Sequence, residues 1–271
     1  MKRIGRSILS NAAGISNFLY LLIALLGFVL VWYGTIYLLS VPNFLLPKPD
    51  VVIREIIFRA PLLCRHMQVT LNETLLGFFL AIVVSVPVSV AVVWWKPVEK
   101  TLVPIMVFLQ TVPKIAVAPL FIVWFGFGYV PKILISFLLA YFPIVIEMIT
   151  GMRDVPFEML DLAKSMSATA FQQFVKIRIP NSLPYFFNGL KLGMLLSLTG
   201  AITAEFMGST EGLGYLIMYA NVRLNTPLLF AVLIILLILG KVAYSVVEWV
   251  ERAAVSWHVV FREREKVQFT V

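Results

Sequence analysis

Three ionisable residues interrupt apolar stretches that are long enough to cross a bilayer: Lys114, Glu147 and Glu205. Charged side chains are costly at membrane depth, so residues of this kind are candidates for function by default. Lys114 follows Gln110 and Thr111, and this polar group is suited to contact an anionic solute. Two other interpretations of Lys114 remain open, which are pairing with a carboxylate and extension of the ammonium group toward water.

Glu205 is preceded by three hydroxyl residues, Ser197, Thr199 and Thr203, within the same apolar stretch. Such a group could line the outer half of a translocation path. It could equally be a set of structural partners, and the sequence gives these two interpretations the same weight. Glu147 is close to a predicted span end, which indicates an interfacial position.

Glu73 is close to the start of another predicted span, and we expect it at the outer interface rather than in a proton relay. A catalytic centre is not indicated elsewhere. Cys64 is the single cysteine, and the two histidines, His66 and His258, are far apart in the sequence. These residues do not predict a disulfide, a metal site or an enzyme.

The only Gly-Lys pair, Gly240-Lys241, lacks the flanking residues of a phosphate-binding P-loop. We therefore expect no cofactor on this chain, and energy must come from another chain or from an ion gradient.

Composition sets the class of the protein. Apolar residues make up 61% of the 271 residues, charged residues only 13%, and the mean hydropathy is +0.95. Soluble domains have roughly 45–50% apolar residues, so this chain is a polytopic membrane protein. The net charge of +8 is spread along the chain, which does not indicate a nucleic-acid partner.

Six membrane spans are predicted in one all-α transmembrane domain, residues 1–271. They cover about 18–39, 69–94, 102–125, 131–149, 184–207 and 227–247. The first run is too long for a signal peptide and is kept as a span. Lys and Arg are most frequent on the side that would hold both termini, so the positive-inside rule predicts that both termini are cytoplasmic. The tail 248–271 is predicted to be solvated, and Asp50–Met67 to be an amphipathic helix at the outer interface.

A polar insert, residues 151–183, separates the fourth and fifth spans. Asp154 or Val155 can cap a first helix, and Thr169-x-x-Gln172 is a capping-box pattern for a second, which Pro180 is expected to end. Two short helices are more than a connection needs, which favours a cytoplasmic docking surface. The alternative is an amphipathic hairpin on the inner leaflet, which the acidic residues of the insert disfavour.

The insert resembles the EAA motif of ABC importer permeases. The similar segments are Asp161-Leu162-Ala163-Lys164-Ser165-Met166-Ser167 and Ile177-Arg178-Ile179-Pro180. The family has glycine at the position of Ser167, where the chain makes a left-handed turn, so the form of this turn is left open. Further segments resemble the nitrate, sulfonate and taurine group of these permeases: residues 45–49, 113–121, 124–128, 141–144, 204–208 and 212–215.

This resemblance implies a type I, MetI-like permease fold in a bacterial inner membrane. It also implies a homodimer, two ATPase subunits that carry ATP and magnesium, and an extracytoplasmic binding protein. The residues that would couple to the ATPase are Phe157, Met159, Leu160, Asp161, Ala163, Lys164 and Ser167. The implied cargo is a small anionic or heterocyclic solute. A gradient-driven secondary transporter is the alternative, although six spans with one large insert fit it poorly.

Overall fold

The computed structural model describes residues 20–255, apart from 21, 22, 25, 28 and 43. All regular secondary structure in these described residues is helical, as expected for an all-α membrane protein. The elements are α2 (Pro49–Phe58), α3 (Ala60–Trp94), α4 (Lys96–Thr111), α5 (Lys114–Phe125), α6 (Tyr129–Arg153), α7 (Phe157–Ser165), α8 (Ala170–Gln173), a π-helical segment (Phe174–Arg178), α9 (Ile179–Phe206), α10 (Leu213–Val222) and α11 (Thr226–Ala254). A further helical segment, Val29–Leu38, precedes them.

Four helical runs in the described chain are long and apolar enough to cross a membrane. They are α3, α6, the continuous run Ala170–Phe206 and α11. Helices α4 and α5 form a bent pair with an angle of 96°, which makes up to five spans. The first predicted span, 18–39, lies partly outside the described residues.

The predicted third span, Leu102–Phe125, is not one straight helix, because the chain bends between α4 and α5. Val112 is extended, with a ψ angle of 127°, and Pro113 precedes the first residue of α5. Proline has no N–H to donate, and its ring disfavours helical backbone at the residue before it. In contrast, Pro87 and Pro143 lie inside continuous helices.

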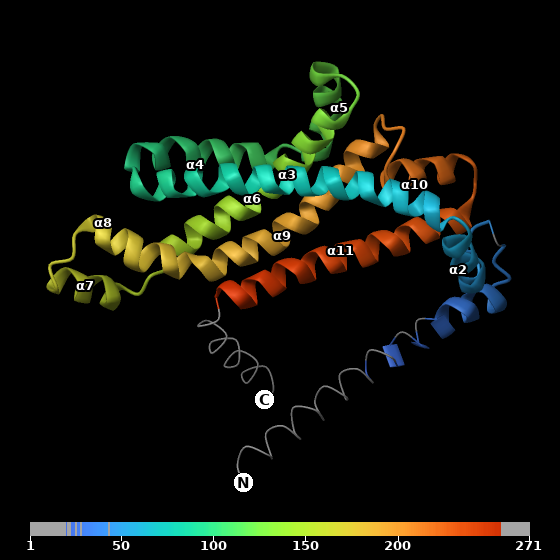
Figure 1. The fold of residues 1–271 in the computed structure, drawn as a ribbon, viewed down its shortest axis with the longest axis horizontal. Coiled ribbons are helices and arrows are strands. Elements are labelled where there is room, and N and C mark those ends of the chain that lie inside the picture. Colours follow the sequence, from blue (N-terminus) through green and yellow to red (C-terminus); the bar gives the residue numbers. More distant parts are fainter. Residues whose placement is uncertain (1–19, 21–22, 25, 28, 43, 256–271) are drawn as a thin grey trace, which may run out of the picture. The chain divides into compact units, whose positions relative to one another are not determined.

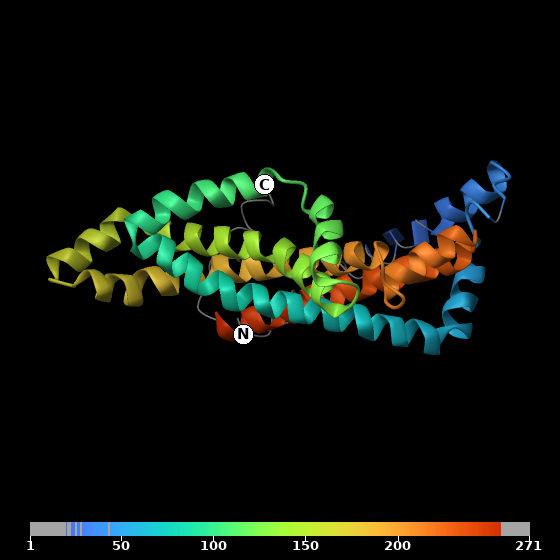
Figure 2. The ribbon, with the colours of Figure 1, turned by 90° about the horizontal axis from the view of Figure 1, so that it is seen from above.

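The chain divides into two compact units. The larger contains Pro61–Met218 and the chain from Val232 onward, and α6 and α9 pack against each other at its centre (Figures 1 and 2). Small residues permit this close contact, because a Cβ atom at Gly200 would lie 2.8 Å from Cα of Ser136. The buried cluster around the pair includes Phe78 of α3, Ile144 of α6 and Val247 of α11.

The smaller unit contains residues up to Ala60 together with Tyr219–Ala231. In its described part, the indole N–H of Trp32 donates to the carbonyl oxygen of Pro47 at 3.1 Å. The Trp32 ring also lies 5.4 Å from the ring of Phe230, measured between centroids. These contacts join the first helical segment to the turn before α2 and to the start of α11.

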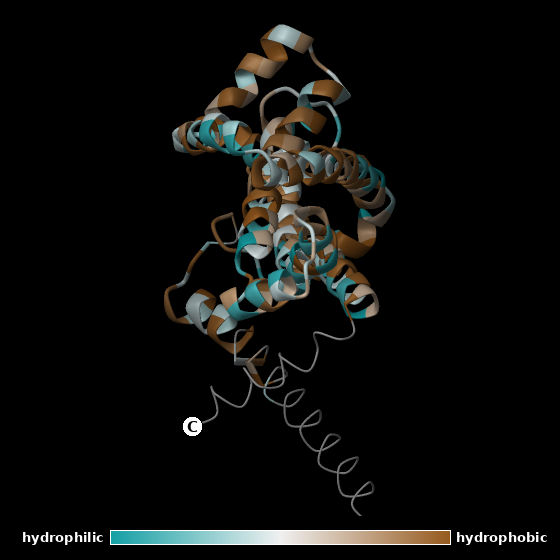
Figure 3. Ribbon diagram, turned by 90° about the vertical axis from the view of Figure 1, so that its left-hand side faces the viewer, coloured by the Kyte–Doolittle hydropathy of each residue, from teal (hydrophilic) through white to brown (hydrophobic). Residues whose placement is uncertain are grey.

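Many large apolar side chains are exposed, and Figure 3 shows that apolar residues, in brown, occur along the helices. Phe79, Val123 and Leu237 are 65%, 79% and 73% exposed, respectively. In water this surface would be unfavourable, whereas in a bilayer it is the surface that contacts lipid or another apolar chain.

Three predicted boundaries are wrong. The interfacial helix Asp50–Met67 is divided, because α2 ends at Phe58 and the later residues belong to α3. Pro180 does not end the second helix of the insert, since the chain remains helical through the π-helical segment into α9. The tail is not solvated from residue 248, because α11 continues to Ala254 and buries Glu251.

Candidate functional site

Helices α7 and α8 form a hairpin at one end of the larger unit, to the left in Figure 1. Helix α7 begins at Phe157 after Pro156, which has no side-chain oxygen to cap it. The predicted cap by Asp154 or Val155 is therefore wrong. Helix α8 does have the predicted capping box, in which Thr169 and Gln172 exchange side-chain-to-backbone hydrogen bonds of 2.9 and 3.2 Å.

The turn between the two helices is left-handed at Ser167, with φ of 59°. The N–H of Ser167 donates to Lys164 O at 2.8 Å, and the N–H of Ala168 donates to Ala163 O at 3.0 Å. This pair of bonds is the Schellman arrangement that ends many helices, usually with glycine at the left-handed position. Ser167 therefore makes the same kind of turn that the EAA resemblance associates with glycine.

Helix α7 exposes an apolar surface. Met159, Leu162 and Met166 share one side of the helix by their spacing and are 50%, 63% and 75% exposed, and Phe157 is 81% exposed. Ala163 is only 9% exposed, so it lies at the edge of this surface where α7 meets the rest of the chain. The sequence analysis selected Ala163 and missed Leu162 and Met166, although their i, i+4 spacing was a signal for a shared face.

The polar coupling candidates lie beside this surface. Asp161 and Lys164 form an exposed ion pair of 3.0 Å, and Leu160 is half-buried. Exposed ion pairs contribute little to stability, so folding does not depend on the pair of Asp161 and Lys164. The side chains remain available for contact with a partner.

The hairpin is tied to the bundle by Asn181 at the start of α9. Its Nδ2 donates to the carbonyl oxygens of Gly151 and Asp154, both at 2.8 Å. The hydroxyl of Tyr185 donates to the carboxylate of Asp154. We call these residues the hairpin clamp. It fixes both ends of the insert to each other, because Gly151 and Asp154 precede α7 while Asn181 and Tyr185 follow α8.

Lys114 starts α5 directly after the break, and its side chain is half-buried. Its Nζ lies 4.9 Å from the centroid of the Phe142 ring, and it forms no ion pair with the described carboxylates. Gln110 and Thr111 are exposed at the end of α4. The three polar residues therefore flank the bend between two helices rather than lie along one span.

Ser197 and Thr203 face the interior of the chain. The hydroxyl of Ser197 donates to the carbonyl oxygen of Thr74 in α3 at 2.9 Å, and the hydroxyl of Thr203 donates to Thr199 O within α9 at 2.7 Å. Ser197 is 0% exposed and Thr203 is 9% exposed. In this conformation both hydroxyl groups donate to backbone carbonyls, and their place along a translocation path stays a prediction.

Glu205 is also buried, at 1% exposed. Its Oε1 accepts from the hydroxyl of Thr70 at 2.7 Å, and its Oε2 accepts from the N–H of Gly214 at 2.5 Å. Glu205 thus joins α9 to α3 and to the first turn of α10. These contacts are structural ones, and a role of Glu205 along a translocation path stays a prediction.

Glu73 and Lys132 form a buried ion pair that the sequence analysis missed. Lys132 Nζ lies 2.7 Å from Glu73 Oε1 and 2.8 Å from Ser209 Oγ. Glu73 is 0% exposed, so its carboxyl group is enclosed by the chain itself. The spacing of His66, Thr70 and Glu73 puts these polar residues on one face of α3, and this signal was present in the sequence.

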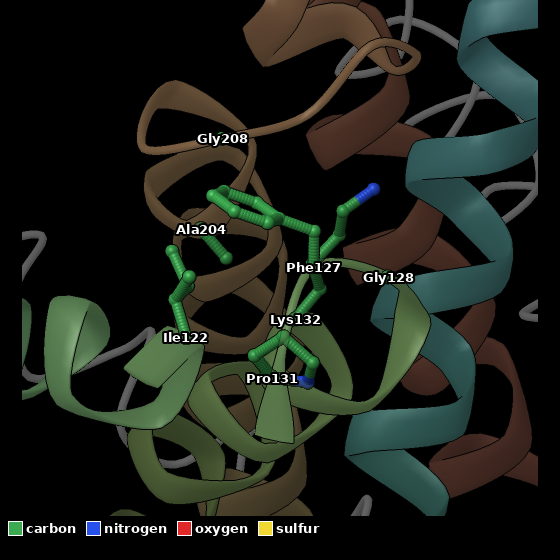
Figure 4. A pocket seen from close by; sticks show the side chains of 7 residues that line it. All are labelled: Ile122, Phe127, Gly128, Pro131, Lys132, Ala204 and Gly208. Carbon is green, nitrogen blue, oxygen red and sulfur yellow. The ribbon is translucent and has the colours of Figure 1, made fainter. Parts of the chain in front are cut away.

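A shallow pocket of about 210 Å³ lies beside this ion pair (Figure 4). Its lining residues are Ile122, Phe127, Gly128, Pro131, Lys132, Ala204 and Gly208. The ring of Phe127 lies against Gly208, where a Cβ atom would be 2.5 Å from the ring. Lys132 is already paired with Glu73, and most of the other lining groups are apolar. The described residues also contain no group of three His, Cys, Asp or Glu side chains that could hold a metal ion.

Comparison with known proteins decides the class. Residues 74–256 match the family described as binding-protein-dependent transport system inner membrane component. The chain belongs to this family. It is therefore a permease subunit of an ABC importer and a multi-pass component of the inner membrane, not an enzyme. This membership decides against the gradient-driven alternative.

Relatives of the permease match over most of their lengths. An ABC transporter permease protein of Haemophilus influenzae is 35% identical over 221 residues, which are 82% of this chain and 90% of the relative. The formylaminopyrimidine transport permease protein of Halalkalibacterium halodurans is 31% identical over 84% of this chain and 92% of its own length. An aliphatic sulfonates transport permease protein of Bacillus subtilis is 35% identical over 78% of each chain.

A solved structure supports the fold. The permease resembles a chain of the MetNI methionine ABC transporter in an inward-facing conformation, with a TM-score of 0.63 and 21% identity. The match covers 72% of this chain and 97% of that chain. This likeness supports the MetI-like fold that the sequence resemblance implied.

Proposed function

We propose that this permease works as a homodimer with two ATPase subunits and imports a small solute delivered by an extracytoplasmic binding protein. The observation that carries this proposal is the exposed apolar surface of α7 at the end of the bundle, made by Phe157, Met159, Leu162 and Met166. In this proposal both termini and the α7–α8 hairpin are cytoplasmic, as the distribution of basic residues predicts.

The hairpin clamp supports a role for α7 as a mechanical link. An apolar helix that is held by three hydrogen bonds at its base can transmit displacement to the helices that carry it. Asn181 and Tyr185 belong to α9, which packs along α6 in the centre of the larger unit. Closure of the ATPase pair would therefore move α6 and α9 together and shift the permease between two states.

Replacing Leu162 by aspartate tests the docking surface. Leu162 is 63% exposed, so the charge should not disturb folding, but it would be buried without a partner in an apolar contact. We expect at least about tenfold weaker binding of the ATPase subunit, measured by co-purification and by titration in detergent. Val222→Asp is the matched control, because Val222 is 78% exposed and belongs to a different helix, α10. Equal retention of ATPase by both variants would contradict the docking role.

We further propose that the cargo is a small anionic or heterocyclic compound. The relatives are named for different cargoes, among them aliphatic sulfonates, taurine, riboflavin and formylaminopyrimidine. Lys114 supports the anionic class, since it is half-buried at the helix break and forms no ion pair with the described carboxylates. A lysine in this position can provide positive charge for an anion without the loss of an internal salt bridge.

Stimulation of ATP hydrolysis by candidate cargoes and their binding proteins, in reconstituted complexes, would identify the compound. With an anionic cargo, Lys114→Met should lower uptake while assembly and basal ATP hydrolysis persist, and Lys114→Arg should restore part of the uptake. Full uptake by the methionine variant would assign Lys114 to packing against Phe142. This result would leave the docking role of α7 intact, because the two experiments measure separate properties.

A further inference from the structure

One buried cluster contains Glu73 of α3, Lys132 near the start of α6 and Glu205 at the end of α9. It has two acidic side chains and one basic side chain. Glu73 is 0% exposed, Glu205 is 1% exposed, and Lys132 is 9% exposed. If both carboxyl groups are ionised, the cluster holds two negative charges against one ammonium group. An uncompensated buried carboxylate is costly, because the protein interior solvates charge far less well than water does.

The hydrogen bonds of the cluster show which carboxyl oxygen has no partner. Glu73 Oε1 accepts from Lys132, whereas Glu73 Oε2 is buried and receives no hydrogen bond from a described donor. Both oxygens of Glu205 already accept, one from Thr70 and the other from Gly214. Thr70, which shares a face of α3 with Glu73, donates to Glu205, so the carboxyl groups of Glu73 and Glu205 belong to the same buried network and interact electrostatically.

Two ionised carboxylates have no hydrogen atom to place between them, and they repel each other. A single proton removes the repulsion, gives Glu73 Oε2 a hydrogen-bonding partner and leaves one net negative charge opposite Lys132. We propose that Glu73 and Glu205 share one proton, so that the cluster is a proton-binding site. The proton belongs to the pair rather than to either residue.

The other ionisable groups near this site have partners of their own. On α3, His66 Nδ1 accepts from the N–H of Gly212 at 2.9 Å and its ring stacks on Tyr215 of α10. In the loop before α10, Glu211 pairs with Arg65 of α3 at 2.5 Å. On α6, the Tyr129 ring lies 5.4 Å from Lys132 Nζ. Lys132 is therefore the ammonium or guanidinium group that contacts the carboxyl pair.

The proton would also hold the loop between α9 and α10 in place. Lys132 donates to Ser209 of this loop, and Glu205 accepts from Gly214 directly after it. If the loop moves away and water enters, the second carboxyl group can ionise and release its proton to solvent. Closure of the loop would take one proton up again. This inference does not depend on the identity of the cargo or on ATPase docking.

Infrared spectroscopy of the purified full-length permease, in a detergent without ester or carboxyl groups, tests the proposal directly. A protonated carboxyl group has a C=O stretching band that carboxylates lack. We expect this band near neutral pH in the wild type, and we expect it to decrease as the pH is raised. It should be absent in both Glu73→Gln and Glu205→Gln, because each variant leaves one carboxylate opposite one ammonium.

Glu251→Gln is the matched control, since Glu251 is a buried carboxylate with its own buried ammonium partner, Lys191, at 3.0 Å. The band should persist in this variant. A wild type without the band, or a band that survives both Glu73→Gln and Glu205→Gln, would overturn the proposal.

Lys132→Met provides a second test if the glutamine variants do not fold. Without the ammonium group, neither carboxyl group has a compensating charge, so both should be protonated. The band should then be about twice as intense as in the wild type and should persist to higher pH. An unchanged band intensity and pH response in Lys132→Met would contradict the shared proton.

Discussion

The two ends of the α6–α9 pair are held by different kinds of interaction. At the hairpin end, amide and hydroxyl groups of Asn181 and Tyr185 contact the chain before α7, and apolar side chains point outward. At the other end, the loop 207–212 is held by buried charged residues, among them Lys132 and Glu205, and its own backbone lies against them.

This difference indicates how each end can move. The hairpin is fixed at its base and free on its surface, which suits a segment that contacts a partner and moves as one body. The loop is fixed by Lys132 and Glu205, and these buried groups lose hydrogen bonds to Ser209 and Gly214 if the loop opens. We therefore expect substitutions in the loop to cost more stability than comparable substitutions in the hairpin.

Gly212→Ala should have the largest effect. Gly212 has φ of 108°, which side chains rarely adopt, and an added Cβ would overlap the carboxyl group of Glu205. Strained backbone alone costs roughly 1–3 kcal/mol, and displacement of Glu205 adds to it. We expect a loss of at least about 3 kcal/mol in unfolding free energy, measured by denaturation in detergent.

Gly126→Ala is the control for this prediction. Gly126 also has a positive φ, 75°, but no other atom lies within 4 Å of the position that a Cβ would take. It should show the cost of backbone strain without the overlap. Equal losses for the two variants would mean that contact with Glu205 does not restrict the loop.

Asn181→Ala should have an intermediate effect at the hairpin end. The variant removes two hydrogen bonds to backbone carbonyls, which together contribute roughly 1–2 kcal/mol. We expect faster amide hydrogen exchange in residues 151–168, while α9 remains protected. A hairpin that exchanges at the wild-type rate in this variant would show that Asn181 does not hold it.

Gln173→Ala is matched to that change, since Gln173 Nε2 also donates to a backbone carbonyl, Ala168 O, at 3.0 Å. This bond lies within the hairpin and does not join it to α6 or α9. The control should alter exchange only near residue 168.

The sequence predicted the features that depend on neighbouring residues. The capping box at Thr169 and Gln172 is local, and the spans follow from hydropathy, which is why α3, α6, α9 and α11 were placed close to their observed positions. The sequence does not show which proline bends the chain, because Pro113 follows a break at Val112 whereas Pro87 and Pro143 lie inside continuous helices.

Residues that interact across long sequence distances could not be assigned in this way. Lys132 and Glu73 are 59 residues apart, and Thr70 and Glu205 are 135 apart. Each appeared to be an isolated charge or hydroxyl near a span end, and the sequence contains no local signal for its partner. Ala163 was selected and Leu162 was not for another reason, since the face of α7 that lies against the rest of the chain is set by tertiary contacts such as the hairpin clamp at Asn181.

Ser167→Gly should have the smallest effect and the opposite sign. A left-handed backbone at a residue other than glycine costs about 1 kcal/mol, and Ser167 has φ of 59°. Glycine removes this cost and keeps the N–H bonds to Lys164 O and Ala163 O, although it also increases the freedom of the unfolded chain. We expect a net gain of roughly 0.5 kcal/mol, seen as slower amide exchange in α7. Ser165→Gly, two residues earlier and within the helix, should instead speed exchange, because glycine costs about 0.5–1 kcal/mol in a helix. If Ser167→Gly also speeds exchange, the serine side chain itself supports the turn, and the hairpin end is more tightly specified than its exposed surface indicates.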